Sequence, residues 1–250
     1  MSTTRIAVVM GASQGIGDAL ALRLEDDGFD VAVNDIPSLA ESLKAVVEKI
    51  QQKGRHFLIV TGDVSNENDV KTVVDKVVET LGGLDVMVPN ASIALLKFIV
   101  KTSVEEYDRV MSVNAKGVFL SFKYAALQMI KQGRGGSIIG ACSMAGKMGM
   151  PNLSVYIASK FAVRGLTQTC ALEWAKHAIT VNSYAPGMIC MPLSAFKRQC
   201  RVTVDMLGHT KDTPIAEPTV IGELIFYLVK PESQFVHGQC ININGGIVFD

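Results

Sequence analysis

Tyr156, Lys160 and Ser143 are the residues whose types and spacing fit a single reaction. Tyr156 and Lys160 lie four residues apart in a segment that reads as helix, and Ser143 precedes Tyr156 by thirteen residues. Residues four apart share one face of a helix, so the phenol and the ammonium would be neighbours. This spacing predicts a tyrosine that transfers a proton during catalysis.

A proton donor beside a carbonyl oxygen is what the interconversion of a ketone and an alcohol requires. The pKa of a free phenol is about 10, and a nearby ammonium lowers it, so that the tyrosinate can also act as a base. Ser143, a neutral donor, would hold the carbonyl or alkoxide oxygen beside the phenol. The alternative is a purely structural role, with Ser143 as a polar residue at a strand end and Tyr156 as a buried ring beside the Lys160 side chain.

A glycine-rich turn follows the first apolar run and has the spacing Gly-x-x-x-Gly-x-Gly, from Gly11 through Gly15 to Gly17. Glycines let the backbone approach a pyrophosphate closely, and the free N–H groups of the helix that follows attract the anion. The turn therefore predicts a dinucleotide site. An ordinary glycine-rich turn is the alternative.

Two carboxylates follow the next two predicted strands. Asp35 stands eighteen residues past Gly17, where a carboxylate accepts hydrogen bonds from the adenosine ribose and repels a 2′-phosphate by roughly 4 kcal/mol at about 4 Å. NAD is therefore favoured over NADP, although Asp35 could merely begin the loop before Pro37. Asp63 is expected at the adenine edge, with a turn or helix-capping role as the alternative.

Short β-branched runs alternate with longer helical patterns such as Val70, Val73, Val74 and Val77, which face a sheet at three- and four-residue spacing. Apolar strands separated by such helices indicate a parallel sheet covered on both faces. We predict one α/β domain over residues 1–250, a doubly wound Rossmann-like fold with a substrate loop or lid at about 188–213. The seven expected strands are Ile6–Met10, Asp30–Asn34, His56–Thr61, Leu84–Val88, Ser137–Ala141, Thr180–Ser183 and Gln239–Ile243.

Charge and hydropathy indicate a small-molecule partner. Lys plus Arg and Asp plus Glu number 24 each, without blocks of like charge, which argues against a general surface for nucleic acid or membrane. No apolar stretch reaches the roughly 18 residues of a membrane helix, and the first apolar run begins at Ile6, too early for a signal peptide. We expect a cytoplasmic protein. The scattered cysteines have no zinc-site spacing, and no metal is expected.

Together these motifs resemble the classical short-chain dehydrogenase/reductase family over nearly the whole chain. Matching by motif gives Asn114, Ser143, Tyr156 and Lys160 as the active site, and implies that Asn114 supports a water chain from Lys160 to solvent; a helix amide bonding its own backbone is the alternative for Asn114. The family also implies a homotetramer. The residues assigned to the coenzyme are Gly11, Ser13, Gln14, Gly15, Ile16, Gly17, Asp35, Ile36, Asp63, Val64, Asn90, Ala91, Tyr156, Lys160, Pro186, Gly187 and Ile189.

Two departures from the family pattern affect the coenzyme side. The family's Asn-Asn-Ala-Gly is Pro89-Asn90-Ala91-Ser92 here, so that proline removes a backbone donor and serine adds a side chain. Met191 stands where a threonine often contacts the nicotinamide amide. That hydrogen bond must come from the backbone or be missing.

The substrate is open between two classes. The stretch from Gly135 to Tyr184 is most similar to acetoin/diacetyl reductases and meso-2,3-butanediol dehydrogenases, which implies a small hydroxyketone. Several methionines are expected around the substrate site, and their flexible thioether side chains make an adaptable apolar wall. This favours a largely apolar alcohol or ketone, terpenoids included. A non-catalytic dinucleotide sensor or scaffold is the alternative of another class, but an intact Ser–Tyr–Lys set favours an enzyme. The methionines expected to line the substrate site are Met144, Met150, Met188 and Met191.

Overall fold

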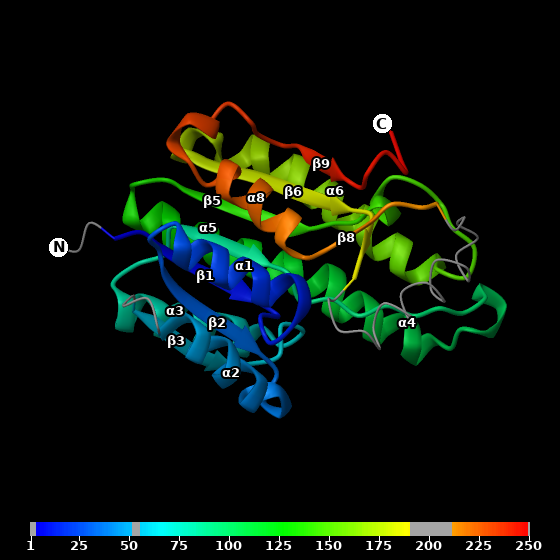
Figure 1. Ribbon diagram of the computed structural model, residues 1–250, viewed down its shortest axis with the longest axis horizontal. Helices are drawn as coiled ribbons and strands as arrows, with labels where there is room; N and C mark the ends of the chain where they lie inside the picture. The colour runs from blue at the N-terminus through cyan, green and yellow to red at the C-terminus, as the bar shows by residue number, and fades with distance from the viewer. Residues whose placement is uncertain (1–3, 52–55, 191–211, 250) are drawn as a thin grey trace.

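A seven-stranded parallel sheet forms the centre of the molecule (Figure 1). The computed structural model describes residues 4–51, 56–190 and 212–249. The strand order is β3-β2-β1-β4-β5-β6-β9, and every neighbouring pair is parallel, which confirms the predicted fold class. The strands are β1 (Ile6–Met10), β2 (Asp30–Asp35), β3 (Phe57–Thr61), β4 (Val86–Pro89), β5 (Gly136–Ala141), β6 (Ile179–Pro186) and β9 (Cys240–Ile243).

The strand order reverses beside β1. The chain proceeds from β1 outward to β2 and β3, then returns to the other side of β1 with β4; Val9 pairs with Val33 of β2 and with Val88 of β4. The connections that leave β1 and β4 at their carboxyl ends therefore diverge to opposite faces. A crevice at such a point is where ligands bind in open parallel sheets.

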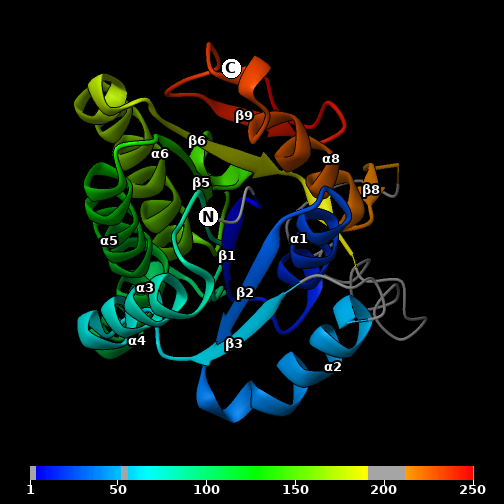
Figure 2. The same ribbon diagram turned by 90° about the vertical axis from the view of Figure 1, so that its left-hand side faces the viewer.

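Helices cover both faces of the sheet (Figure 2). One layer contains α1 (Gly15–Asp26), α2 (Ala40–Gln51) and α8 (Thr219–Leu228). The opposite layer contains α3 (Glu67–Leu81), α5 (Gly117–Gln132) and α6 (Ser154–Trp174), with α4 (Val104–Met111) leading into α5.

Alternate residues of β1 build the two cores. Ile6, Val8 and Met10 are buried against α3, α5 and α6, whereas Ala7 and Val9 are buried against α1, α2 and α8. Successive side chains of a strand point to opposite faces, so a strand covered on both sides must be apolar at every position. That is why β1 reads as a continuous apolar run.

Helix α3 confirms the predicted periodicity. Val70, Val73, Val74 and Val77 are all buried. Its N-terminus is capped by the Asn66 side chain, which accepts hydrogen bonds from the N–H groups of the second and third helical residues.

Most strands differ from the sequence prediction by one or two residues at a boundary, and two differences are larger. β6 extends to Pro186 because Tyr184, Ala185 and Pro186 pair with β9, so a segment expected to leave the sheet remains in it. The predicted loop or lid at 188–213 begins as a strand: β7 (Met188–Ile189) pairs with β8 (Ile215–Ala216). Residues 191–211 of that prediction lie outside the described residues.

None of the helices described by the structure is long and apolar enough to cross a bilayer. Within the same ranges, His, Cys, Asp and Glu side chains form no group of three that could hold a metal ion.

The Asn66 cap gives a test of the local packing. Asn66→Ala should lower the free energy of unfolding by about 1 kcal/mol, because two N–H groups at the start of α3 lose their acceptor. Urea denaturation measures the change. Asn68→Ala, which replaces an exposed residue of the same turn whose side chain caps nothing, is the matched control and should not reproduce the loss. Equal stability of Asn66→Ala and the unmodified protein would contradict the capping role.

Candidate active site

The glycine turn between β1 and α1 needs its glycines for two reasons. Gly11 and Gly15 have φ of +76° and +62°, a region that favours glycine. A Cβ on Gly11 would also lie 2.6 Å from the Cα of Ala91, and one on Gly17 would collide with the Gly11 carbonyl. The turn, the start of α1 and the chain leaving β4 are therefore in direct backbone contact.

Hydrogen bonds hold the turn against the end of β2. The N–H groups of Gly11 and Ala12 both donate to the Asn34 carbonyl, at 2.8 and 2.9 Å. The Ser13 N–H donates to Oδ2 of Asp35 at 3.1 Å. The Ser13 hydroxyl is buried and has no hydrogen-bond partner among the described residues. A buried hydroxyl without a partner is costly, and its place in the turn fits a phosphate oxygen of a dinucleotide.

A cavity of about 660 Å³ extends from this turn along the carboxyl ends of the strands. Ten of the residues predicted to bind coenzyme line it: Gly11, Gln14, Gly15, Ile16, Asp35, Ile36, Asp63, Val64, Asn90 and Ala91.

Other lining residues were missed by sequence reasoning. Arg109, Ser112 and Val113 line the same cavity from the end of α4 and the turn after it. Their spacing of three and four residues was the available signal, since it places all three on one helical face. The remaining missed residues are Asn34, Leu39, Gly62, Ser65, Ser92 and Ile93.

The two predicted carboxylates have different surroundings. Asp35 accepts one backbone N–H at each oxygen, from Ser13 at 3.1 Å and from Ile36 at 2.9 Å. A carboxylate has about four acceptor positions, so further hydrogen bonds remain open to it. Oδ1 of Asp63 instead accepts both the N–H and the hydroxyl of Ser65, which is the turn role weighed for it. Helix capping belongs to Asn66.

Lys160 connects Tyr156 of α6 to the end of β5, and Ser143 follows that strand end by two residues. The Lys160 ammonium is buried, donates to the Ala141 carbonyl at 2.9 Å and lies 5.4 Å from the centroid of the Tyr156 ring. A buried ammonium is costly unless it is partnered, and here the carbonyl and the ring face are its partners. The lysine thus ties the α6 tyrosine to the strand end that precedes the serine.

Ser143 begins the short 3-10 turn Met144–Gly146 directly after the strand. Its Oγ accepts the Ala145 N–H at 3.1 Å, which orients the side chain and leaves the hydroxyl proton available to donate. A hydroxyl with a free proton can donate a hydrogen bond to a substrate oxygen.

Asn114 lies in the π-helical turn Ser112–Lys116 that joins α4 to α5. Its amide accepts from the N–H of Ile93 at 2.9 Å and donates to the carbonyl of Ile93 at 2.8 Å and to the Ser159 hydroxyl at 3.1 Å. Insertions of this kind recur at functional sites. Asn114 therefore connects the loop after β4 to the helix of Tyr156 rather than bonding its own backbone; its part in a water chain stays a prediction.

The departure at Pro89 is accommodated by its position. Pro89 is the last residue of β4, and the N–H of Asn90 still reaches the Met10 carbonyl at 3.0 Å. The Asn90 side chain donates to the Gly11 carbonyl at 2.8 Å. Ser92 is exposed and lines the cavity, so its side chain obstructs no backbone contact.

The remaining predicted residues lie outside that cavity's lining. Ser13, Gly17, Tyr156 and Lys160 are placed as described above. Pro186 ends β6, Gly187 donates to the Ile243 carbonyl at 3.2 Å, and Ile189 belongs to β7.

The four methionines differ in exposure. Met144 is buried, whereas Met150 and Met188 are half-buried, and Met191 lies outside the described residues. Their contact with substrate stays a prediction.

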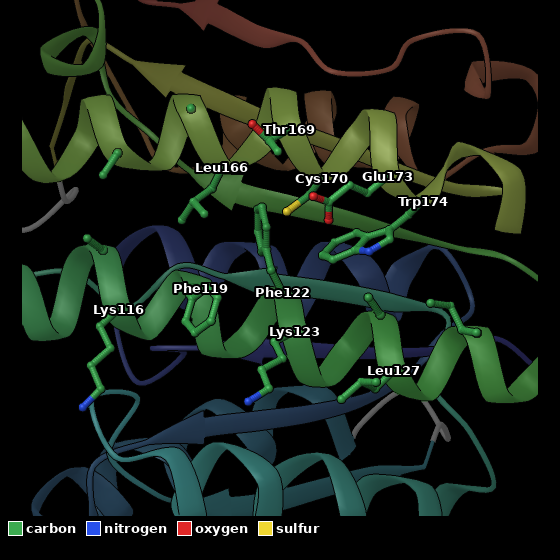
Figure 3. A pocket seen from close by; sticks show the side chains of 15 residues that line it. Lys116, Phe119, Phe122, Lys123, Leu127, Leu166, Thr169, Cys170, Glu173 and Trp174 are labelled. Atoms are coloured by element: carbon green, nitrogen blue, oxygen red, sulfur yellow. The ribbon is translucent and has the colours of Figure 1, made fainter.

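A second hollow, of about 860 Å³, lies between α5 and α6 and contains none of the predicted site residues (Figure 3). The rings of Phe122 and Trp174 meet there edge to face, with centroids 6.4 Å apart. Phe119 and Leu127 of α5 are about half exposed, at 46% and 56%. This apolar hollow shares no lining residue with the cavity at the glycine turn.

The short chain dehydrogenase family model matches residues 5–201. The chain belongs to the short-chain dehydrogenase family. This short-chain dehydrogenase is 45% identical over 256 residues to a short-chain dehydrogenase/reductase of Armillaria gallica, covering 100% of the chain and 98% of that relative. It is 36% identical over 252 residues to the 3-oxoacyl-[acyl-carrier-protein] reductase FabG of Staphylococcus aureus, covering 99% of each.

Solved structures agree with the family assignment. A short-chain type dehydrogenase/reductase from Mycobacterium marinum superposes with a TM-score of 0.88 at 32% identity, covering 98% of this short-chain dehydrogenase and 96% of that chain. The acetoin dehydrogenase YohF from Salmonella typhimurium superposes with a TM-score of 0.86 at 28% identity and the same coverage. The protein is therefore an oxidoreductase of a family that typically uses a nicotinamide dinucleotide.

The collision at Gly17 predicts the effect of one methyl group on coenzyme binding. Gly17→Ala should abolish measurable NADH binding, because the added Cβ forces the Gly11 carbonyl and the start of α1 apart. Fluorescence titration with NADH measures the affinity, and circular dichroism checks folding. Gly149→Ala adds the same methyl at an exposed glycine with nothing within 4 Å, and should bind NADH normally. Unchanged NADH affinity in Gly17→Ala would refute the close-approach argument.

Proposed function

We propose that this short-chain dehydrogenase is an NAD(H)-dependent oxidoreductase that interconverts a secondary alcohol and its ketone, with Tyr156 as the acid and base. The observation that carries the proposal is the buried Lys160 ammonium, held between the Ala141 carbonyl and the Tyr156 ring at the strand end that leads to Ser143. A protein that only bound a dinucleotide would have no need of a buried cation beside a phenol.

The roles of the side chains follow from their surroundings. A bound nicotinamide supplies the hydride for reduction, or accepts it in the reverse reaction. Ser143 donates a hydrogen bond to the substrate oxygen and keeps its proton; its Oγ already accepts the Ala145 N–H, which orients the hydroxyl. Tyr156 gives its proton to the same oxygen during reduction and takes it back during oxidation. The positive charge of Lys160 stabilises the tyrosinate left behind.

The choice of NAD rests on Asp35. Its carboxylate lines the coenzyme cavity and keeps acceptor positions for ribose hydroxyls. A 2′-phosphate at the same place would meet a like charge.

A largely apolar alcohol or ketone, with terpenoids as one class, is the substrate we propose, on the strength of the methionines expected around the reacting end. Acetoin or 2,3-butanediol is the second candidate, supported by the likeness to the acetoin dehydrogenase YohF. Turnover with a panel of both substrate classes distinguishes the two.

A homotetramer and a cytoplasmic location complete the proposal. The exposed apolar side chains of α5 and α6 around the 860 Å³ hollow support burial of this face against a second copy. Sedimentation of the purified protein measures the assembly.

Tyr156→Phe should reduce turnover by roughly 10²- to 10⁴-fold while leaving NADH affinity nearly unchanged, because it deletes the transferred proton and keeps the ring beside Lys160. NADH absorbance with a panel of ketones and alcohols measures turnover, and fluorescence titration measures binding.

Tyr227→Phe, which removes a half-exposed phenol on α8, is the matched control and should remain fully active. Wild-type turnover in Tyr156→Phe would eliminate the assigned proton donor. NADH binding by the unmodified protein without turnover on any compound of a broad panel would instead favour the dinucleotide sensor.

Asp35→Ser should shift the ratio of kcat/KM for NADPH over NADH upward by about tenfold or more, because it removes the charge that repels a 2′-phosphate. Steady-state kinetics with both coenzymes give the ratio. Asp63→Asn removes a carboxylate from the same cavity but away from the predicted ribose site, and should leave the ratio unchanged. The same ratio in Asp35→Ser and the unmodified protein would reject the role of Asp35.

A further inference from the structure

Tyr184 is a fully buried phenol in β6 that none of the roles above uses. Its hydroxyl donates to Oδ1 of Asn90 at 2.8 Å, a contact between residues 94 positions apart. Burial raises the pKa of Tyr184 well above its usual value. The phenol therefore stays protonated and can act as a hydrogen-bond donor to Asn90.

Asn90 also contacts the glycine turn between β1 and α1. Its Nδ2 donates to the Gly11 carbonyl at 2.8 Å. A carbonyl oxygen only accepts hydrogen bonds, so Nδ2 and not Oδ1 must face Gly11. With Tyr184 donating to Oδ1, both ends of the amide are assigned and the side chain is held in one orientation. Gly17, in the first turn of α1, packs directly on the same Gly11 carbonyl.

The main chain of Tyr184 reaches the reacting end. Its carbonyl accepts the Cys142 N–H at 3.0 Å, one residue before Ser143. One residue of β6 thus contacts both the strand end that positions the substrate oxygen and, through Asn90, the turn expected to hold the pyrophosphate. In the sheet order β5 and β4 lie between β6 and β1, and the Tyr184 hydroxyl reaches past β5 to Asn90, which follows β4.

We propose that Tyr184 is a positioning residue for coenzyme binding: its hydroxyl orients the Asn90 amide, which holds the Gly11 carbonyl against the start of α1. The inference rests on the proposed use of a nicotinamide dinucleotide. Without the hydroxyl, Oδ1 of the half-buried Asn90 loses its donor, and an inverted amide would set this oxygen against the Gly11 carbonyl. The turn then loses the one arrangement that fits a pyrophosphate.

Tyr184→Phe removes this hydroxyl and keeps the ring. The dissociation constants of NADH and of ADP-ribose should both rise about tenfold, because both ligands contain the pyrophosphate, whereas kcat at saturating NADH should fall less than twofold. Fluorescence titration measures both ligands. Thr167→Val is the matched control: it deletes another fully buried hydroxyl, which donates to the Val163 carbonyl at 2.9 Å in α6, and should leave both constants unchanged.

A double-mutant cycle separates positioning from a general loss of stability. Asn90→Ala should weaken NADH binding, and adding Tyr184→Phe to it should weaken binding no further, because the hydroxyl acts through the amide. Additive losses would overturn the proposal, as would unchanged constants in Tyr184→Phe, equal weakening in Thr167→Val, or weakening of NADH without ADP-ribose. Failure of the unmodified protein to bind either ligand would instead refute the proposed coenzyme, and the inference with it.

Discussion

The buried Lys160 ammonium is the interaction on which the arrangement of the reacting end depends. A cation taken out of water is stable only where the surrounding atoms replace its hydration. Here the Ala141 carbonyl and the Tyr156 ring do so, and both come from elements fixed by the sheet: the end of β5 and the first turns of α6. The same requirement that stabilises the charge therefore holds the phenol beside the strand end that leads to Ser143.

The coenzyme side depends on close approach of backbone to backbone. Gly11 lies against Ala91, and Gly17 lies against Gly11, so that β1, β4 and α1 converge where the strand order reverses. Polar side chains tie this junction together, with Asn90 bridging the turn to Tyr184 and Asp35 accepting from the turn itself. A parallel sheet leaves its carboxyl edge open at this point, and short hydrogen bonds give that edge a defined shape.

Periodicity in the sequence was sufficient for the fold. The α3 valines and the unbroken apolar runs predicted helices on both faces of a parallel sheet, because burial on two sides leaves no polar position in a strand. Ten predicted coenzyme residues line one cavity. Arg109, Ser112 and Val113 were missed because only the folded chain brings the end of α4 to the same cavity as the glycine turn, which is about ninety residues earlier in the sequence. The extension of β6 was missed for a similar reason, since pairing with β9 overrides the local turn signal of Pro186 and Gly187.

The sequence by itself determined the fold class and the glycine turn, and it predicted the Ser–Tyr–Lys set, since these depend on local spacing: a repeat of two residues in a strand, about four residues per helical turn, and glycine at positions 11 and 15, where φ is positive. Only the tertiary structure decided which polar groups are partners. Asn114 could have bonded its own helix, and it bonds Ile93; Asp63 could have capped α3, and it closes a turn on Ser65. A polar side chain bonds the donors and acceptors that lie near it in the folded structure. For partners far apart in the sequence, local spacing does not predict that proximity.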